Sequence, residues 1–341
     1  MSAPRAIILG VEGTALGKDE SAFLRDADPW GFILFARNVE APDQVERLTD
    51  ALRRAVGRDA PVLVDQEGGR VARMRRPHWR EWAWTPALRE RLAGPDNRAA
   101  LEEALCLRFR LIAHELSAVG IDVNCMPILD VPQSFTDPII ADRALGADAE
   151  EVTRHGRIAA EALMAGGVAP VVKHMPGQGR AAVDSHAELP RVDAGLDALR
   201  EVDFAPFAAL ADLPMGMTGH VVFEALDPEG PATTSAAAIR VIRHEIGFDG
   251  LLMTDDLDMQ ALSGTPAQRA SAAIAAGCDV ILHCNGSRAE METTVAVVPE
   301  LTGAALRRAD AALAARGAAQ DFDPARADAR LASLSGEGAD V

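Results

Sequence analysis

The chain alternates short apolar runs with longer amphipathic segments along most of its length, and this alternation limits the folds that it can adopt. The apolar runs have the length of buried strands, and the segments between them have helical periodicity. Parallel strands joined by helical crossovers produce this pattern. Closing eight such units gives a (β/α)8 barrel, so we predict an α/β, TIM-like single domain, with an open doubly wound sheet as the alternative. The predicted strands are Ala6–Gly10, Gly31–Phe35, Pro61–Val64, Ile121–Met126, Val168–Val172, Met215–Thr218, Gly250–Met253 and Asp279–His283.

The segments between the predicted strands have the 3.6-residue period of amphipathic helices. After Ser287 the sequence continues as a predicted Ala-rich helix to about Arg316 and ends in an Ala/Asp-rich tail. We therefore expect a catalytic barrel over residues 1–316 and a tail over 317–341 that packs on the barrel or frays from it. The clearest predicted helices are Gln44–Val56, Arg98–Val119, Glu150–Ala165, Leu196–Leu210, Ala236–Ile246 and Pro266–Ala276.

The overall charge argues against two classes of partner. The net charge of -17 repels phosphodiester backbones and anionic lipid, so we expect neither nucleic acid nor membrane as a partner. No apolar run approaches the roughly 20 residues that span a bilayer. The first residues, Met1 to Arg5, lead directly into a predicted strand without the successive regions of a signal peptide. We therefore expect a cytoplasmic protein.

The four cysteines are scattered, with no Cys-x-x-Cys pair. Cys125 and Cys278 lie in or beside predicted strands, which favours buried, reduced thiols over zinc ligands or disulfides. This interpretation agrees with a reducing compartment.

Polar side chains follow the predicted strands at the points where several of them end. Asp65 ends the third strand, Lys173 and His174 the fifth, and Asp255 the seventh, while His220 follows the sixth. Because the active sites of (β/α)8 barrels lie at the carboxyl ends of their strands, these residues are expected to converge in one site.

The stretch from Val172 to His186 is the strongest single candidate for catalysis. A buried strand is predicted to stop at Lys173 and His174, and Pro176, Gly177 and Gly179 then impose an irregular loop. The loop continues into Asp184-Ser185-His186. A purely structural loop is the alternative, but packing alone does not explain a core strand that ends in two basic residues.

Each of the other candidates also has a structural alternative. Asp255 could act as nucleophile or could cap the next helix, and the adjacent Asp256 is assigned the cap or a supporting role. Asp65 and Arg73 could bind sugar hydroxyls or form an ion-pair network at the barrel mouth, and Asp142-Arg143 could do either. His220 could bind substrate or be a hydrogen-bonded core residue.

The tryptophans at positions 79, 82 and 84 could stack on a sugar, although loop packing is the favoured interpretation.

The sequence offers little support for a metal or a cofactor. Val11-Glu12-Gly13 stands where a metal-binding His-x-His would follow the first strand, and Lys173 would add a cation to any site formed by His174, His186 and His220. No Gly-x-Gly-x-x-Gly follows the first strand. We therefore predict an enzyme without a metal or cofactor.

Two sets of motifs resemble a known family. Val241-Ile242-Arg243 followed by Gly250-Leu251-Leu252-Met253-Thr254-Asp255 resembles the active-site signature of glycoside hydrolase family 3. Lys173-His174-Met175-Pro176-Gly177-Gln178-Gly179 with Asp184-Ser185-His186 resembles the subgroup of bacterial β-N-acetylhexosaminidases that recycle peptidoglycan. Gln178 and Met175 depart from the usual residues of the loop, but neither position has a named role.

The resemblance implies a role for each candidate residue. Asp255 would be the nucleophile, His186 the general acid/base and Asp184 its orienting partner. The residues that would hold an N-acetylglucosamine unit are Asp65, Arg73, Arg143, Lys173 and His174, with His220 as a further candidate. A histidine can serve as both acid and base near neutrality, because its reference pKa is roughly 6.5.

The expected substrate is therefore a small carbohydrate, an N-acetylglucosamine-anhydromuropeptide, hydrolysed with retention by a monomer or weak homo-oligomer. A β-N-acetylglucosaminide phosphorylase on the same scaffold, a family 3 β-glucosidase and a non-catalytic sugar-binding barrel are the alternatives.

Overall fold

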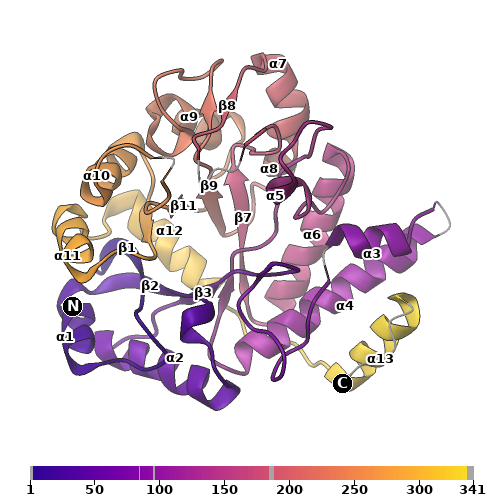
Figure 1. Cartoon of the computed structure of the whole chain (residues 1–341), viewed down its shortest axis with the longest axis horizontal. Coiled ribbons are helices and arrows are strands. Elements are labelled where there is room, and N and C mark those ends of the chain that lie inside the picture. Colours follow the sequence, from indigo (N-terminus) through magenta and orange to yellow (C-terminus); the bar gives the residue numbers. More distant parts are fainter. Residues whose placement is uncertain (1–2, 84, 95–96, 184–187, 261, 336–341) are drawn as a thin grey trace.

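The computed structural model describes residues 3–83, 85–94, 97–183, 188–260 and 262–335. Its centre is a closed barrel of parallel strands in the order β1-β12-β11-β9-β7-β6-β3-β2, surrounded by helices (Figure 1). β1 pairs with β12 on one side and with β2 on the other, and this closes the sheet. The predicted (β/α)8 fold is therefore confirmed, and the open-sheet alternative is wrong.

All the predicted barrel strands are present, and their interior residues are buried. Their side chains form the apolar core between the barrel and the helices, as the near-continuous apolar runs of a fully covered parallel sheet require. Their bounds are β1 (Arg5–Gly10), β2 (Pro29–Leu34), β3 (Val62–Val64), β6 (Val123–Asn124), β7 (Ala169–Met175), β9 (Met215–Thr218), β11 (Leu251–Asp256) and β12 (Val280–His283).

The fifth barrel strand differs from the prediction at its end. β7 does not stop at Lys173 but continues through His174 to Met175. The backbone carbonyl of Lys173 accepts a hydrogen bond from Leu129 N at 2.7 Å, so the ladder goes on beyond the apolar run. Charged residues can occupy the buried end of a strand when acidic partners compensate them, and the lysine has such partners.

Short additional strands lie at the carboxyl end of the barrel. β4 (Gln66–Gly68) and β5 (Val71–Ala72) form an antiparallel hairpin directly after β3. β8 (Arg191–Val192) pairs in parallel with β10 (Val222–Phe223). The β4–β5 hairpin contributes to the candidate active site.

The helices cover the outside of the barrel (Figure 1). Some begin at a side-chain cap, such as Thr265 before α10, and α2 and α10 end at a glycine with positive φ, Gly57 at 66° and Gly277 at 115°. They are α1 (Lys18–Ala27), α2 (Pro42–Val56), α3 (Thr85–Arg91), α4 (Arg98–Ser117), α5 (Pro138–Ala141), α6 (Ala149–Ala165), α7 (Leu196–Ala198), α8 (Ala205–Ala209), α9 (Ala236–Arg240), α10 (Pro266–Ala276), α11 (Arg288–Val297), α12 (Gly303–Ala314) and α13 (Pro324–Ser335). π-helical turns follow α7 (Leu199–Asp203) and α9 (Val241–Glu245).

The Ala-rich helix predicted after Ser287 is two helices, α11 and α12. The break between them contains Pro299, whose carbonyl accepts a hydrogen bond from Ala6 N at 2.9 Å, while Leu301 N donates to Pro4 O at 2.8 Å. Proline cannot continue a helical ladder, and here the freed backbone pairs with the start of the chain instead.

The last described helix lies outside the barrel. α13 packs along α4 (Figure 1) and buries Ala327 and Leu331. An ion pair of 2.6 Å joins Arg330 to Glu103 on α4.

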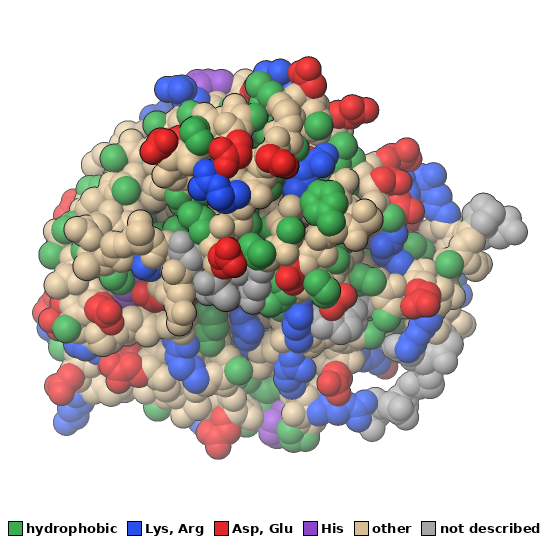
Figure 2. Space-filling view, turned by 45° about the horizontal axis from the view of Figure 1, so that its top comes forward, with side chains coloured by type: hydrophobic (Ala, Val, Ile, Leu, Met, Phe, Trp, Pro, Cys, Tyr) green, Lys and Arg blue, Asp and Glu red, His purple; other side chains and the backbone are tan. Residues whose placement is uncertain are grey.

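Figure 2 shows acidic and basic side chains interspersed on the visible face, without a broad patch of one sign. Within the described residues, no helix combines the length and apolarity that crossing a membrane requires. All four cysteines are free, and Cys125 and Cys278 are buried, which confirms the prediction for these two.

Candidate active site

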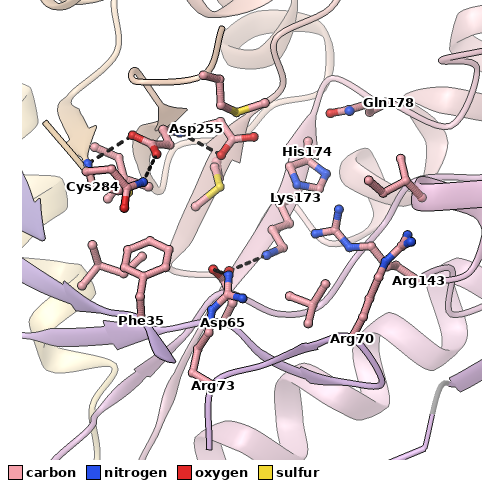
Figure 3. A pocket seen from close by; sticks show the side chains of 18 residues that line it. Phe35, Asp65, Arg70, Arg73, Arg143, Lys173, His174, Gln178, Asp255 and Cys284 are labelled. Carbon is pink, nitrogen blue, oxygen red and sulfur yellow. Dashed lines mark hydrogen bonds and ion pairs between the residues drawn. The ribbon is translucent and has the colours of Figure 1, made fainter. Parts of the chain in front are cut away.

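A pocket of about 380 Å³ opens at the carboxyl ends of the barrel strands. Figure 3 shows Asp255 on one side of it and Asp65 on the other, with Lys173 and His174 between them. The predicted residues that line the pocket are Asp65, Arg73, Arg143, Lys173, His174 and Asp255. The structure thus brings these strand ends together in one pocket, as the alternation of strands and helices predicted.

Charged side chains form a connected network at the bottom of the pocket. The Lys173 ammonium lies 2.8 Å from Asp65 Oδ1 and 2.8 Å from Glu67 Oε1. Arg143 donates from Nε and Nη2 to the two oxygens of Glu67 at 2.9 and 2.8 Å, and Arg73 Nη2 donates to Asp65 Oδ2 at 2.9 Å. Every charged group of the network therefore has an opposite partner within hydrogen-bond distance.

The network holds its members in their charged forms. Burial alone would raise the pKa of the Asp65 carboxyl, but the charges of Lys173 and Arg73 outweigh burial and hold this pKa well below its usual range. The pKa of Glu67 falls to about 2 for the same reason, because Arg143 and Lys173 outweigh burial there. The pKa of Lys173 is raised, since its two carboxylates outweigh the effect of burial. These charges do not change across the neutral pH range.

Glu67 was missed by the sequence analysis, although a usable signal existed. Asp65 and Glu67 are two residues apart in an extended segment, so their side chains point to the same side. Gly68 follows with a φ of 106°, and a Cβ there would lie 2.1 Å from the Arg108 guanidinium. The helix α4 thus packs directly behind the segment that carries Glu67, and Arg108 donates to the Glu67 carbonyl at 2.8 Å.

His174 belongs to a second buried pair. Asp130 Oδ2 accepts a hydrogen bond from His174 Nδ1 at 2.7 Å, and Asp130 Oδ1 accepts from Gln178 N at 2.6 Å. The carboxylate fixes the ring so that its other nitrogen is left for the pocket that His174 lines. Asp130 was also missed, because it lies six residues beyond β6, where the strand-end rule no longer applies.

Asp255 occupies the end of β11 and lines the pocket. Its Oδ1 accepts a hydrogen bond from Asp256 N at 2.8 Å. Burial would raise the pKa of Asp255, but the positive potential of His174 and His220 prevails and the pKa is lowered. The carboxylate is therefore ionised near neutral pH, as a nucleophile must be.

Asp256 connects the end of β11 to the end of β12. It accepts hydrogen bonds from Cys284 N at 3.1 Å and from Asn285 Nδ2 at 2.9 Å. Burial and the neighbouring Asp258 raise the pKa of Asp256 to about 6. The pKa values of the two adjacent acids thus shift in opposite directions, because the histidines outweigh burial at Asp255, whereas burial and Asp258 prevail at Asp256.

His220, a predicted substrate-binding residue, does not line the pocket. It is 0 % exposed. Its ring nitrogens lie 2.8 Å from Thr233 Oγ1 and 3.0 Å from Asp256 O. His220 is therefore a buried, hydrogen-bonded residue beside the pocket, and its contact with substrate stays a prediction.

Trp79 and Trp82 do not line this pocket. Trp79 and Trp82 line a separate cavity of about 650 Å³ between the loop after β5, α4 and α13. Trp82 Nε1 donates to Glu115 Oε2 at 3.2 Å, and the Arg80 and Arg108 guanidiniums lie 5.1 and 5.8 Å from its ring centroid. This packing agrees with the loop interpretation. Trp84 lies outside the described residues.

Asp184 and His186, the predicted acid/base pair, also lie outside the described residues. The chain is described up to Val183 and again from Glu188. Ala181 O accepts a hydrogen bond from Asp137 N at 3.0 Å, which places the approach to this segment beside the turn that precedes α5.

The part of the chain that the structure describes contains no group of three or more His, Cys, Asp or Glu side chains placed to hold a metal ion.

Comparison with known proteins identifies the family. Residues 9–314 match the glycosyl hydrolase family 3 N-terminal domain. A β-hexosaminidase from Alkalilimnicola ehrlichii is 40% identical over 285 residues, which cover 82% of this chain and 80% of the relative. A β-hexosaminidase from Pseudomonas aeruginosa is 36% identical over 299 residues, 87% of each protein.

Solved structures agree with these sequence relatives. NagZ from Neisseria gonorrhoeae in complex with N-trifluoroacetyl-D-glucosamine superimposes with a TM-score of 0.86 at 28% identity, over 98% of this chain and 99% of that one. A family 3 β-N-acetylglucosaminidase from Paenibacillus gives a TM-score of 0.83 at 28% identity, over 97% of this chain and 67% of that one. The resemblance inferred from the motifs is confirmed: this chain belongs to glycosyl hydrolase family 3 and is a glycoside hydrolase.

Proposed function

We propose that the protein is a retaining β-N-acetylhexosaminidase that releases terminal β-linked N-acetylglucosamine from peptidoglycan-derived muropeptides. The central observation is the combination, in one pocket, of an ionised carboxylate at Asp255 with the fixed charges of Asp65 and Lys173. The names of the relatives and the sugar analogue bound to the Neisseria protein support the choice of sugar.

In the proposed mechanism, Asp255 attacks the anomeric carbon while cationic His186 protonates the glycosidic oxygen. A covalent glycosyl-enzyme forms, and the leaving group departs with the proton. Neutral His186 then deprotonates water, which attacks the same carbon, displaces Asp255 and restores the β configuration. Asp184 orients the imidazole and stabilises its cationic form.

The remaining residues hold the sugar in this mechanism. Asp65 and Arg73 offer an acceptor and donors to sugar hydroxyls, and Lys173, His174 and Arg143 add donors. Their mutual ion pairs hold the side chains in place before substrate arrives, so little ordering is needed on binding.

Two basic residues of the pocket support the proposal that the aglycone is anionic. Arg70 and Arg73 both line it, and Arg70 is exposed. A guanidinium at the rim favours a carboxylate-bearing leaving group. Comparing hydrolysis of an N-acetylglucosaminyl-anhydromuramic acid with hydrolysis of chitobiose tests this part. Equal kcat/KM on both would contradict the muropeptide assignment while leaving the sugar assignment intact.

A cytoplasmic location and a monomer or weak homo-oligomer complete the proposal. These expectations are based on the net charge of -17 and on the free cysteines, which agree with a reducing compartment.

Trapping the intermediate tests the nucleophile. A slow fluorinated N-acetylglucosamine analogue with a good leaving group should label the protein once, and peptide mapping should place the sugar on Asp255. A label on another residue would contradict the mechanism.

His186→Ala tests the acid/base. The variant should lose most activity on a substrate with a poor leaving group but keep the first step on a highly activated aryl N-acetylglucosaminide. His244→Ala, which changes an exposed histidine, is the matched control. An unchanged rate of His186→Ala on the poorly activated substrate would remove His186 from the mechanism.

A further inference from the structure

The loop that follows β7, residues 176–183, is attached to the neighbouring segment on one side. Gln178 N donates to Asp130 Oδ1 at 2.6 Å, and Thr136 Oγ1 donates to Gly179 O at 2.5 Å. Gly179 packs so closely that a Cβ there would lie 2.1 Å from the carbonyl oxygen of Val131. All these contacts come from the connection between β6 and α6.

On the other side the loop is held by a buried ion pair. Arg180 Nε donates to Asp203 Oδ2 at 2.7 Å, and Asp203, at the end of the π-helical turn after α7, is 1 % exposed. Gly177 lies directly against the same residue, since a Cβ there would be 2.9 Å from the Asp203 carbonyl oxygen. Removing one partner of such a pair leaves a buried charge uncompensated, so the pair constrains the loop strongly.

The loop and the pocket share one carboxylate. Asp130 accepts from Gln178 N in the loop and from His174 Nδ1, and both His174 and Gln178 line the pocket. Movement of the loop from this position would displace Gln178 N and so disturb Asp130, which sets the orientation of the imidazole.

We propose that Arg180 and Asp203 are positioning residues of the active site. The ion pair fixes the loop between Asp203 and the segment after β6, and this keeps Asp130 in the position that aligns His174 and Gln178 in the pocket. Neither residue lines the pocket, so both act through the loop. This inference needs only a glycoside hydrolase with this pocket and does not depend on which sugar or aglycone is the natural one.

The Arg180–Asp203 ion pair also predicts how the enzymatic activity depends on pH. Burial raises the pKa of Asp203 to about 6, against the opposing effect of Arg180, and the charge of Asp130 raises it further. Below that pH the carboxyl is protonated and no longer forms an ion pair with Arg180. Two charged side chains act on the Asp203 carboxyl: Arg180 in the loop and Asp130 on the β6 side. Activity should therefore fall on the acid side with a midpoint near this value.

Asp203→Asn is the test, with an aryl N-acetylglucosaminide that the wild type hydrolyses as substrate. The variant should have kcat/KM lowered roughly 10- to 100-fold at pH 7, as a displaced catalytic geometry predicts. The acid limb near pH 6 should also disappear, because an amide does not titrate there. A loss of folded protein alone would lower the amplitude but leave the shape of the pH profile unchanged.

Asp212→Asn is the matched control. It breaks an exposed ion pair with Arg157, at 2.6 Å, a short distance along the chain. This variant should keep both kcat/KM and the pH profile of the wild type.

A double-mutant cycle keeps the test decisive if Asp203→Asn folds poorly. Arg180→Gln changes the more exposed partner and should reproduce the loss of activity, and the double variant should be no worse than either single one. A folded Asp203→Asn with wild-type kcat/KM and an unchanged acid limb would overturn the proposal, as would additive losses in the cycle. Failure of the wild type on every N-acetylglucosaminide would instead contradict the proposed function, since the positioning test can use any glycoside that is cleaved.

Discussion

The two sides of the pocket differ in how their carboxylates are compensated. On the side of β3 and β7, Asp65 and Glu67 each contact cations at 2.8 to 2.9 Å, and both pKa values are lowered. On the side of β11 and β12, burial and the acidic neighbour Asp258 raise the pKa of Asp256 to about 6. The same residue type is thus permanently charged on one side and titratable on the other.

This difference matches two tasks. Substrate binding benefits from charges that stay constant with pH and from side chains already held in place. Chemistry at Asp255 needs one ionised carboxylate beside less charged surroundings, because the mutual repulsion of a fully ionised cluster of acids would raise the pKa of Asp255. The comparison therefore predicts that changes on the β11 side affect turnover, whereas those on the β3 and β7 side affect binding and stability.

The largest effect is expected from Asp255→Asn. Removing the nucleophile should lower kcat by at least about 10³-fold while leaving the fold intact. Steady-state kinetics with an aryl N-acetylglucosaminide, together with thermal melting, would measure both. A loss of less than 10-fold would mean that another group attacks the sugar.

Lys173→Met should be the most destabilising change on the opposite side. It leaves Asp65 and Glu67 buried without their shared cation, which costs on the order of 3–5 kcal/mol. Urea unfolding measures this loss, and Arg47→Met, at an exposed i,i+4 ion pair with Asp43, is the control. Equal stabilities of the two variants would show that the network does not depend on Lys173.

Glu67→Gln should raise KM more than it lowers kcat, since it loosens Arg143 and Lys173 without touching Asp255. It should also change acid stability. The folded pKa of Glu67 is about 2 against an ordinary value of 4.5, so its stabilisation is present above 4.5 and lost as the pH falls toward 2. The variant should therefore lose less stability than the wild type across that range. Circular dichroism melting between pH 5 and pH 2 would check this, and parallel curves would contradict it.

Asp258→Asn should have the smallest effect. Removing its charge should lower the pKa of Asp256 from about 6. In the wild type the raised folded pKa means that the contribution of Asp256 to stability is fully present below the ordinary value of 3.8 and is lost as the pH rises through 6. The free energy of unfolding of the variant should therefore fall less over this range than that of the wild type. The difference should be on the order of 1 kcal/mol, the energy that corresponds to a pKa change of one unit. Melting temperatures between pH 4 and pH 7 would show the difference.

Sequence reasoning succeeded wherever local pattern was sufficient. The alternation of apolar runs and helices predicted the barrel, and a polar residue at a strand end predicted Asp65, Lys173, His174 and Asp255 in one pocket. It did not foresee that His220, which also follows a strand, is fully buried and does not line the pocket. A strand end places the backbone, whereas the direction of a side chain depends on the pleat and on its neighbours.

The amino-acid sequence by itself determined the order of strands and helices, the residue types at the barrel mouth and the membership in a glycosidase family. Only the tertiary structure decided which charges meet: Lys173 with Asp65 across 108 positions, His174 with Asp130 across 44 and Arg180 with Asp203 across 23. The physical reason is that the ionisation and orientation of a buried group depend on the atoms within a few ångström of it. Those atoms come from segments brought together only when the barrel closes.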